Sequence, residues 1–390
     1  MRAFVVFLFA YVLSQFYRSF LAVIAPELGS ELGLDALALA NMQACWIWAF
    51  VAMQIPVGWA LDTIGPRRAV AATMASAVAG AFLFAAAQSA LALYVAMALI
   101  GVGCSALFMG ALFVFGRIYP AERFALLTSW LIGIGSAGNL LAATPLAWAA
   151  QNIGWRGAML AMAGATALAA LLVLALIRDP ARASTGPERG LVDGLRDVLA
   201  IRSLWPILPI TFVSYSLMLA ERGLWAGPYF SDVHGLAPVA RGNALLAMAA
   251  AMSMGALIYG PLDRIFGTRK WVVAAGSAIT AASFIALGAL DASLATATIL
   301  IAAIGLAGMT YGVLMAHARS FFPEHLLGRG ITLMNAAFIG GAGIMQPISG
   351  AFMKAAKGLD PALAYGRLHL GFGLLLLAAL GVYVWSREKS

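Results

Sequence analysis

The chain has 390 residues, of which 63% are hydrophobic and only 10% are charged. A soluble globular protein carries about 25% charged residues, so a water-soluble fold cannot bury this much apolar surface and the solvent must be lipid. The net charge of +8 at pH 7 mostly reflects the loops on one side of the membrane. Apart from one polar linker, we find no basic face outside the membrane that would bind nucleic acid.

The apolar runs are continuous rather than alternating, which favours helices of about 20 residues over a membrane barrel. The first run is too long for a cleavable signal peptide and has no clean small-residue cleavage site, so we expect it to remain as a span. The sequence therefore predicts an all-α membrane protein with twelve spans, at residues 4–26, 38–61, 69–88, 91–116, 126–149, 157–177, 205–230, 242–260, 271–290, 293–317, 328–353 and 366–386.

One long polar segment, 178–204, divides these spans into six and six. Its prolines, charges and small residues indicate a cytoplasmic linker with room for a short amphipathic helix near 190–201. We therefore expect an N-terminal six-helix bundle at 1–177 and a C-terminal one at 205–390.

Most Lys and Arg residues fall on one side of the predicted membrane, which is expected to be the cytoplasmic side. With both termini inside, the outer loops and span ends hold only Arg156, Arg241, Lys354, Lys357 and Arg367. The compact loops and the lack of a targeting sequence favour a bacterial inner membrane over an organellar one.

The second half of the chain repeats the first. YVLSQFYRSFLA at 11–22 and YSLMLAERGLWA at 215–226 share Tyr, Leu, Arg and Ala at an offset of 204 residues, and Gly101 and Gly305 have the same offset. GWALDTIGPRR at 58–68 and GPLDRIFGTRK at 260–270 are nearly as far apart. These matches predict a duplicated six-helix unit.

The pattern Gly-x-x-x-Asp-x-x-Gly-x-Arg-Arg at 58–68 resembles the cytoplasmic loop signature of the major facilitator superfamily. The resemblance covers the whole chain through its layout of six plus six spans, and it says nothing about the substrate. It implies a cytoplasmic gate built from charged loop residues, here Asp62, Arg67 and Arg68, with Asp263 as a weaker counterpart. The alternative is that these residues only set the topology.

Arg18, Glu221 and Arg222 are the three clear cases of ionisable residues inside the predicted spans. Arg18 precedes Glu27 by nine residues and Arg222 precedes Asp232 by ten, so each arginine lies about 14 Å from the outer boundary, near the midplane. Arg18 belongs to a stripe at helical spacing, and two residues of span 7 repeat its ends. The predicted substrate-binding residues are Tyr11, Ser14, Gln15, Arg18, Tyr215 and Arg222.

In the superfamily, spans 1 and 7 face each other across a central cavity, so the resemblance implies that both arginines point at one site. Guanidinium groups bind planar carboxylates and phosphates well, which predicts an anionic substrate. The alternative is that Glu221 pairs with a neighbouring arginine while Arg18 extends outward as a structural lock.

Two residues are candidates for proton coupling. Glu221 is the only acid inside a span, and His317 lies late in span 10. The alternative for His317 is that it lies near the inner membrane interface and has no role in coupling. The segment MALIGVG at 97–103 lacks the arginine and glutamine usual in the family's span 4, and span 5 lacks the usual Gly-Pro pair of antiporters. Uptake or exchange is therefore favoured over drug export.

The cysteines, methionines and remaining polar residues are weaker indications of a functional site. Cys45 and Cys104 are read as packing residues. Met248 and Met252 are four residues apart and would suit Cu(I), but methionine is a common filler of apolar helices. Further residues could line a cavity or join helices, namely Gln43, Trp46, Gln54, Trp130, Asn139, Tyr311, Asn335 and Gln346.

These observations predict a secondary transporter of a small anionic organic solute that works by alternating access, as a monomer, without a metal or cofactor. No Gly-x-x-x-x-Gly-Lys-Ser/Thr motif for ATP occurs. The alternatives are a transporter of another cargo, such as a vitamin, copper or an amphipathic drug, and a membrane enzyme or sensor. Short loops and scarce acids argue against the enzyme.

Overall fold

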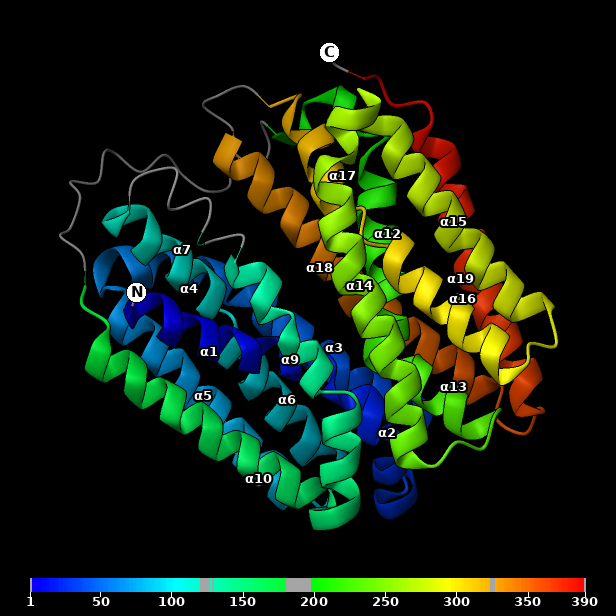
Figure 1. Ribbon diagram of the computed structural model, residues 1–390, viewed down its shortest axis with the longest axis horizontal. Coiled ribbons are helices and arrows are strands. Elements are labelled where there is room, and N and C mark those ends of the chain that lie inside the picture. Colours follow the sequence, from blue (N-terminus) through cyan, green and yellow to red (C-terminus); the bar gives the residue numbers. More distant parts are fainter. Residues whose placement is uncertain (1, 120–126, 128–129, 180–197, 323–326, 389–390) are drawn as a thin grey trace. The chain divides into compact units, whose positions relative to one another are not determined.

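The computed structural model describes residues 2–119, 127, 130–179, 198–322 and 327–388. These residues are helical almost throughout and contain no β-strand, in agreement with the all-α prediction. The helices of the first half are coloured blue to green in Figure 1. They are α1 (Arg2–Tyr17), α2 (Phe20–Leu32), α3 (Ala36–Ala52), α4 (Gln54–Thr63), α5 (Pro66–Ala86), α6 (Ala90–Cys104), α7 (Leu107–Ile118), α9 (Ala137–Leu141) and α10 (Thr144–Leu176).

The second half contains two short non-α turns among its helices. The turn η2 is a π-helix, and it joins α12 to α13 without an interruption of the helical path. The elements are η1 (Arg202–Leu204), α12 (Leu208–Ala220), η2 (Glu221–Trp225), α13 (Ala226–Asp232), α14 (Pro238–Phe266), α15 (Lys270–Ala289), α16 (Leu294–Ala307), α17 (Tyr311–Arg319), α18 (Leu327–Ala355) and α19 (Pro361–Tyr383).

Within the described residues, ten helical stretches are long and apolar enough to cross a membrane, and α1 with α2 forms an eleventh, bent by 42°. One of the ten, Trp130–Leu176, covers both predicted spans 5 and 6. It bends at Gly154, whose φ of 71° is left-handed. The protein is therefore a multi-pass membrane protein, and the number of twelve spans stays a prediction. Most of the predicted linker, and nearly all of its helix near 190–201, lies outside the described residues.

The chain forms two compact units that do not follow the sequence halves completely. Unit 1 comprises residues 1–183, 223–231 and 235–246, and unit 2 comprises 184–222, 232–234 and 247–390. In unit 1, α5 lies beside α6 and α10, and α3 lies beside α6. In unit 2, α19 lies beside α15 and α18 beside α12 (Figure 1). The sequence-based division at the linker stays a proposal.

The repeat-related glycines mark the same close helix contact in each unit. Gly101 on α6 lies against the backbone carbonyl of Trp46 on α3. Gly305 on α16 lies against the carbonyl and side chain of Met248 on α14, and Met252 packs there as well. A side chain at either glycine would push the two helices apart, so glycine at both positions is explained by packing. Met248 and Met252 are buried in this contact.

Candidate functional site

Arg18 lies at the break between α1 and α2. The backbone N–H groups of Arg18 and Ser19 donate to the carbonyls of Gln15 and Phe16, three residues back, instead of continuing the α-helical pattern. The predicted first span is therefore two helices with a bend of 42° at its charged residue. Irregular backbone at membrane depth is tolerated where neighbouring groups satisfy it or where it lines a cavity.

The guanidinium group of Arg18 rests on two aromatic rings of α3. Its central carbon lies 5.1 Å from the Phe50 ring centroid and 5.6 Å from that of Trp46. These two rings are themselves stacked, with centroids 5.2 Å apart. Such cation–π contacts contribute about 0.5–2 kcal/mol each. Among the described residues, no carboxylate forms an ion pair with Arg18.

The predicted stripe on α1 is partly internally bonded. Gln15 Nε2 donates to the Tyr11 hydroxyl at 2.8 Å, as their spacing of four residues predicts. Ser14 is buried beside the thiol of Cys104, which fits the reading of that cysteine as a packing residue. Among the candidate cavity residues, Gln43 Nε2 donates to the Arg18 carbonyl at 3.4 Å.

Two further polar groups meet at this bend in unit 1. Ser19 Oγ donates to Asn139 Oδ1 at 3.0 Å, so a predicted cavity residue of α9 contacts the residue after Arg18. Gly223 also belongs to unit 1, and a Cβ on it would lie 3.5 Å from the Arg18 carbonyl oxygen. The broken first span is thus surrounded by amide, hydroxyl and aromatic groups.

The predicted residues of unit 2 form an aromatic cluster and a charged turn. Tyr215 on α12 lies 5.9 Å from Tyr311 and 6.0 Å from Phe338, measured between ring centroids. The Tyr311 hydroxyl donates to Asn335 Oδ1 at 2.9 Å. Tyr311 and Asn335, predicted separately as cavity residues, therefore meet in one place beside Tyr215.

Glu221 and Arg222 begin the π-helical turn η2 and are both buried. Glu221 Oε2 lies 3.2 Å from His369 Nε2 on α19, and neither side chain is exposed. His369 was not among the site residues predicted from the sequence. A histidine four residues after Tyr365 in an apolar segment was the available signal, but sequence spacing gives no way to pair α19 with α12.

His317, the other proton-coupling candidate, lies elsewhere in unit 2. Its Nδ1 is 2.8 Å from the Tyr383 hydroxyl, and its Nε2 is 3.0 Å from the Arg387 carbonyl oxygen. Tyr383 follows His369 by fourteen residues on the same helix, which is about 20 Å along its axis. The two candidates do not share a site, and a coupling role for His317 stays a prediction.

The conformation of the loop between α4 and α5 explains why glycine and proline occur there. Gly65 has a φ of 96°, which favours glycine, and Pro66 occupies the first turn of α5. Asp179 Oδ1 accepts the N–H of Arg67 at 2.8 Å, and a Cβ on Gly65 would collide with this carboxylate. Arg67 and Arg68 have exposed side chains. The side chain of Asp62 lies outside the described residues, so its gate role stays a prediction.

The corresponding loop of the second half is capped in the same way. Gly267 has a φ of 63°, and the Glu388 carboxylate accepts the N–H groups of Arg269 at 2.5 Å and Lys270 at 3.2 Å. Asp263, the weaker gate candidate, lies 3.5 Å from Arg269 Nε. In each half, an acid that follows the last helix thus binds the positive N-terminal end of the third predicted span. The acid is Asp179 for α5 and Glu388 for α15.

We expect Glu388→Gln to lower the thermal unfolding midpoint at neutral pH and to have no effect in acid. Burial favours a raised pKa for Glu388, but hydrogen bonds from Thr268, Lys270 and Arg269 outweigh it and lower the pKa below 4.5. The stabilisation is therefore complete above pH 4.5 and is lost as the pH falls through the lower folded-state value. Because the group is exposed, the effect is about 0.5 kcal/mol. Thermal unfolding of both proteins from about pH 7 to pH 3.5 measures it, and a pH-independent difference would contradict the assignment.

A buried ion pair joins α2 to the start of α14 within unit 1. Arg241 is only 2% exposed, and its Nη2 donates to Glu27 Oε1 at 2.5 Å and to the Val23 carbonyl at 2.7 Å. From the sequence, Arg241 was predicted to lie in an outer loop, and no partner was predicted for it. The signal was an isolated arginine on the side of the membrane where cations are scarce.

Three more contacts lie in the same part of unit 1. Gly227 on α13 lies against the Ala22 carbonyl, and Gly242 lies against the backbone of Thr144. The Thr144 hydroxyl donates to Asn243 Oδ1 at 2.8 Å. These contacts explain why residues 223–231 and 235–246 belong to unit 1 although they come from the second half of the sequence.

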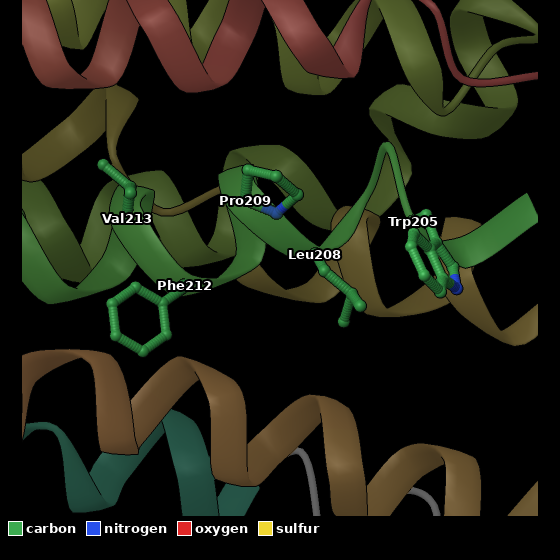
Figure 2. Close-up of a pocket in the computed structure, with 5 residues that line it drawn as sticks. All are labelled: Trp205, Leu208, Pro209, Phe212 and Val213. Atoms are coloured by element: carbon green, nitrogen blue, oxygen red, sulfur yellow. The ribbon is translucent and has the colours of Figure 1, made fainter. Parts of the chain in front are cut away.

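A hollow of about 410 Å³ lies at the start of α12, and Figure 2 shows the side chains that line it. Its lining residues are Trp205, Leu208, Pro209, Phe212 and Val213. The indole N–H of Trp205 already donates to the Leu199 carbonyl at 3.0 Å. None of the five lining residues is charged, so the hollow offers no charged group to an anion. The polar clusters around Arg18 and Glu221 remain the candidate sites.

The chain resembles solved transporter structures along nearly its full length. A bacterial homologue of the human lysosomal transporter Spinster, in an inward-facing and unoccupied conformation, matches with a TM-score of 0.82 over 98% of this chain and 96% of that one, at 17% identity. A D-xylose–proton symporter matches with a TM-score of 0.78 over 99% and 97% of the two chains, at 14% identity. At these low sequence identities, the similarity shows a shared fold and says nothing about the substrate.

Curated relatives match over a shorter region. The probable galactarate/D-glucarate transporter GudP of Bacillus subtilis is 25% identical over 187 residues, which are 46% of this chain and 41% of the relative. GudP of Escherichia coli is 24% identical over 169 residues, 42% and 38% of the two chains. The matched region thus spans about two fifths of these relatives. The sequence profile of the Major Facilitator Superfamily matches residues 7–337. The expectation from the loop signature is confirmed: this chain belongs to the Major Facilitator Superfamily of transporters.

Proposed function

We propose that the protein is a secondary transporter that moves a small anionic organic solute across a bacterial inner membrane by alternating access. The observation that carries the proposal is Arg18. It is a cation inside a predicted span, at a helix break, in contact with two aromatic rings and in no ion pair with a carboxylate in the described part of the chain. Placing an arginine at this depth costs about 2.5–3.5 kcal/mol on insertion scales. A bound anion would supply the missing countercharge.

The proposal places Arg222 in the same substrate site, as the repeat counterpart of Arg18. Its support is the shared register of 204 residues. Tyr11, Ser14, Gln15 and Tyr215 complete the proposed binding residues, and the amide and hydroxyl groups at the break would bind hydroxyls of the solute. The protein would work as a monomer with both termini in the cytoplasm.

The partial relatives give the substrate class a concrete form. Both are named for galactarate and D-glucarate, which are sugar acids with a carboxylate at each end and hydroxyls between. Two arginines and several neutral donors suit such a molecule, because guanidinium groups bind carboxylates in a bidentate manner. We therefore propose a sugar acid or a similar polyhydroxy carboxylate as the solute.

Counterflow in proteoliposomes tests the substrate class. Vesicles preloaded with unlabelled D-glucarate are expected to take up labelled D-glucarate transiently. Galactarate added outside should compete, and D-glucose, which has hydroxyls but no carboxylate, should not. Uptake of glucose, a vitamin or an amphipathic drug in place of every organic anion tried would contradict the proposal and favour a transporter of another cargo.

A further inference from the structure

The pair of Glu221 and His369 is the most deeply buried titratable pair among the described ion pairs. The contacting atoms, Glu221 Oε2 and His369 Nε2, are 3.2 Å apart, and neither side chain has any exposed surface. The second carboxylate oxygen of Glu221, Oε1, has no hydrogen-bond partner in the described part of the chain. An isolated buried charge is expensive, whereas a carboxylate and an imidazole that share one proton are neutral together. The pair can therefore hold or lose a proton according to the charges around it.

The surroundings leave few other charges to compensate this pair. On its own turn lies Arg222, which is 7% exposed. On α19 lie Tyr365, one turn before His369, and Arg367, which is exposed and faces away. Helix α15 contributes the apolar ring of Phe284, 6.1 Å from the histidine ring. The sequence of α12 contains no charged residue, and α15 has only Lys270, at its first position.

A second polar contact lies one helical turn from this pair and involves an exposed acid. The Tyr365 hydroxyl donates to Asp232 Oδ2 at 2.9 Å, and Asp232 ends α13 at an exposed position. The Tyr365 and His369 rings, four residues apart on α19, have centroids separated by 6.4 Å. The pair thus lies one helical turn inward from a carboxylate that water reaches.

The π-helical turn is a second, independent sign of function. Glu221 and Arg222 are its first two residues, and a π-turn within an α-helical path is rare and frequently occurs at functional sites. It sets an acid and a cation side by side on one buried turn, with the acid directed at α19.

We propose that Glu221 and His369 form the proton-binding site that couples solute movement to a proton gradient; this rests on the proposed function of anion transport. Without a proton, the Glu221 carboxylate balances the Arg222 guanidinium while His369 is neutral. When one proton enters, the pair becomes neutral as a whole, and the charge of Arg222 is released to bind the solute anion. When one carboxylate of the solute binds Arg222, it offsets the added positive charge, so the buried group of Glu221, His369 and Arg222 is neutral before the proton enters and neutral again with the solute bound. One proton therefore accompanies each solute molecule.

Proteoliposome uptake under a pH gradient tests the pair with D-glucarate as the probe. With an inward gradient of about two pH units, one coupled proton can drive accumulation up to about 100-fold. The unsubstituted protein is expected to accumulate glucarate, whereas Glu221→Gln and His369→Asn should only equilibrate it. Counterflow, which needs no net proton movement, should persist in both variants. His234→Asn, in the loop between α13 and α14, is the matched control and should accumulate like the unsubstituted protein.

The outcomes separate the two proposals. If the unsubstituted protein neither accumulates nor exchanges any sugar acid, the proposed function fails. If it accumulates glucarate and Glu221→Gln and His369→Asn do so equally, the coupling pair is wrong, and loss of accumulation in His317→Asn alone would identify the other histidine. For variants that do not fold, a pH indicator in weakly buffered detergent solution gives a second measurement on the unsubstituted protein. About one proton taken up per bound glucarate supports the pair, and none overturns it.

Discussion

Arg18→Ala and Arg222→Ala are each expected to raise the KM for D-glucarate by about 10- to 150-fold. Hydrogen bonds to charged groups contribute about 1.5–3 kcal/mol, and each alanine removes one side of such a contact with a carboxylate. Lysine at either position should restore only part of the affinity, because an ammonium group cannot form the bidentate contact. Initial rates of counterflow over a range of glucarate concentrations measure the effect.

The matched control for these variants is Arg367→Ala, which removes an equally charged but exposed residue of α19. Its KM is expected to stay close to that of the unsubstituted protein. If Arg18→Ala and Arg222→Ala also keep the original KM for every sugar acid, the two arginines do not bind the solute. Arg18 would then be a structural lock, with its charge stabilised by Trp46 and Phe50 alone.

Arg241→Ala is expected to loosen the contact between α2 and the start of α14. The substitution leaves the Glu27 carboxylate without its buried partner, which costs about 2 kcal/mol for a partly exposed acid. Under the proposed alternating access, we expect α2 and the start of α14 to separate when this side of the protein opens, so the arrangement with the ion pair loses stability relative to the open one. The ratio of open to closed molecules should rise about 30-fold.

Spin labels at Ser30→Cys and Ala240→Cys, both exposed positions, report on this change in a background without Cys45 and Cys104. Arg241→Ala should add a longer-distance population to the distance distribution between them. Arg156→Ala is the control, since it breaks another arginine–glutamate pair on α2, the more exposed one with Glu31, which joins α2 to α10 within the same half. An unchanged distribution in Arg241→Ala would show that the ion pair does not hold this side closed.

The sequence by itself determined the class of protein, the repeat and the family. Continuous apolar runs admit few folds, because each span must satisfy its own backbone hydrogen bonds in lipid. The loop glycines at 65 and 267 could be recognised because a tight turn with positive φ needs glycine, and the structure has both in that conformation. Gly101 and Gly305 were found from the repeat offset alone, and both lie at close helix contacts.

Only the tertiary structure could decide which polar residues meet. Glu221 was recognised as the single acid inside a span, but its partner His369 is 148 residues away, and helical periodicity says nothing about which helices are neighbours. The same holds for Arg241 with Glu27 and for Asp179 with the start of α5. The break at Arg18 was also beyond the sequence, since no proline or glycine marks it. Spacing along one helix fixes which side chains share a face, whereas contacts between distant segments depend on how the helices pack.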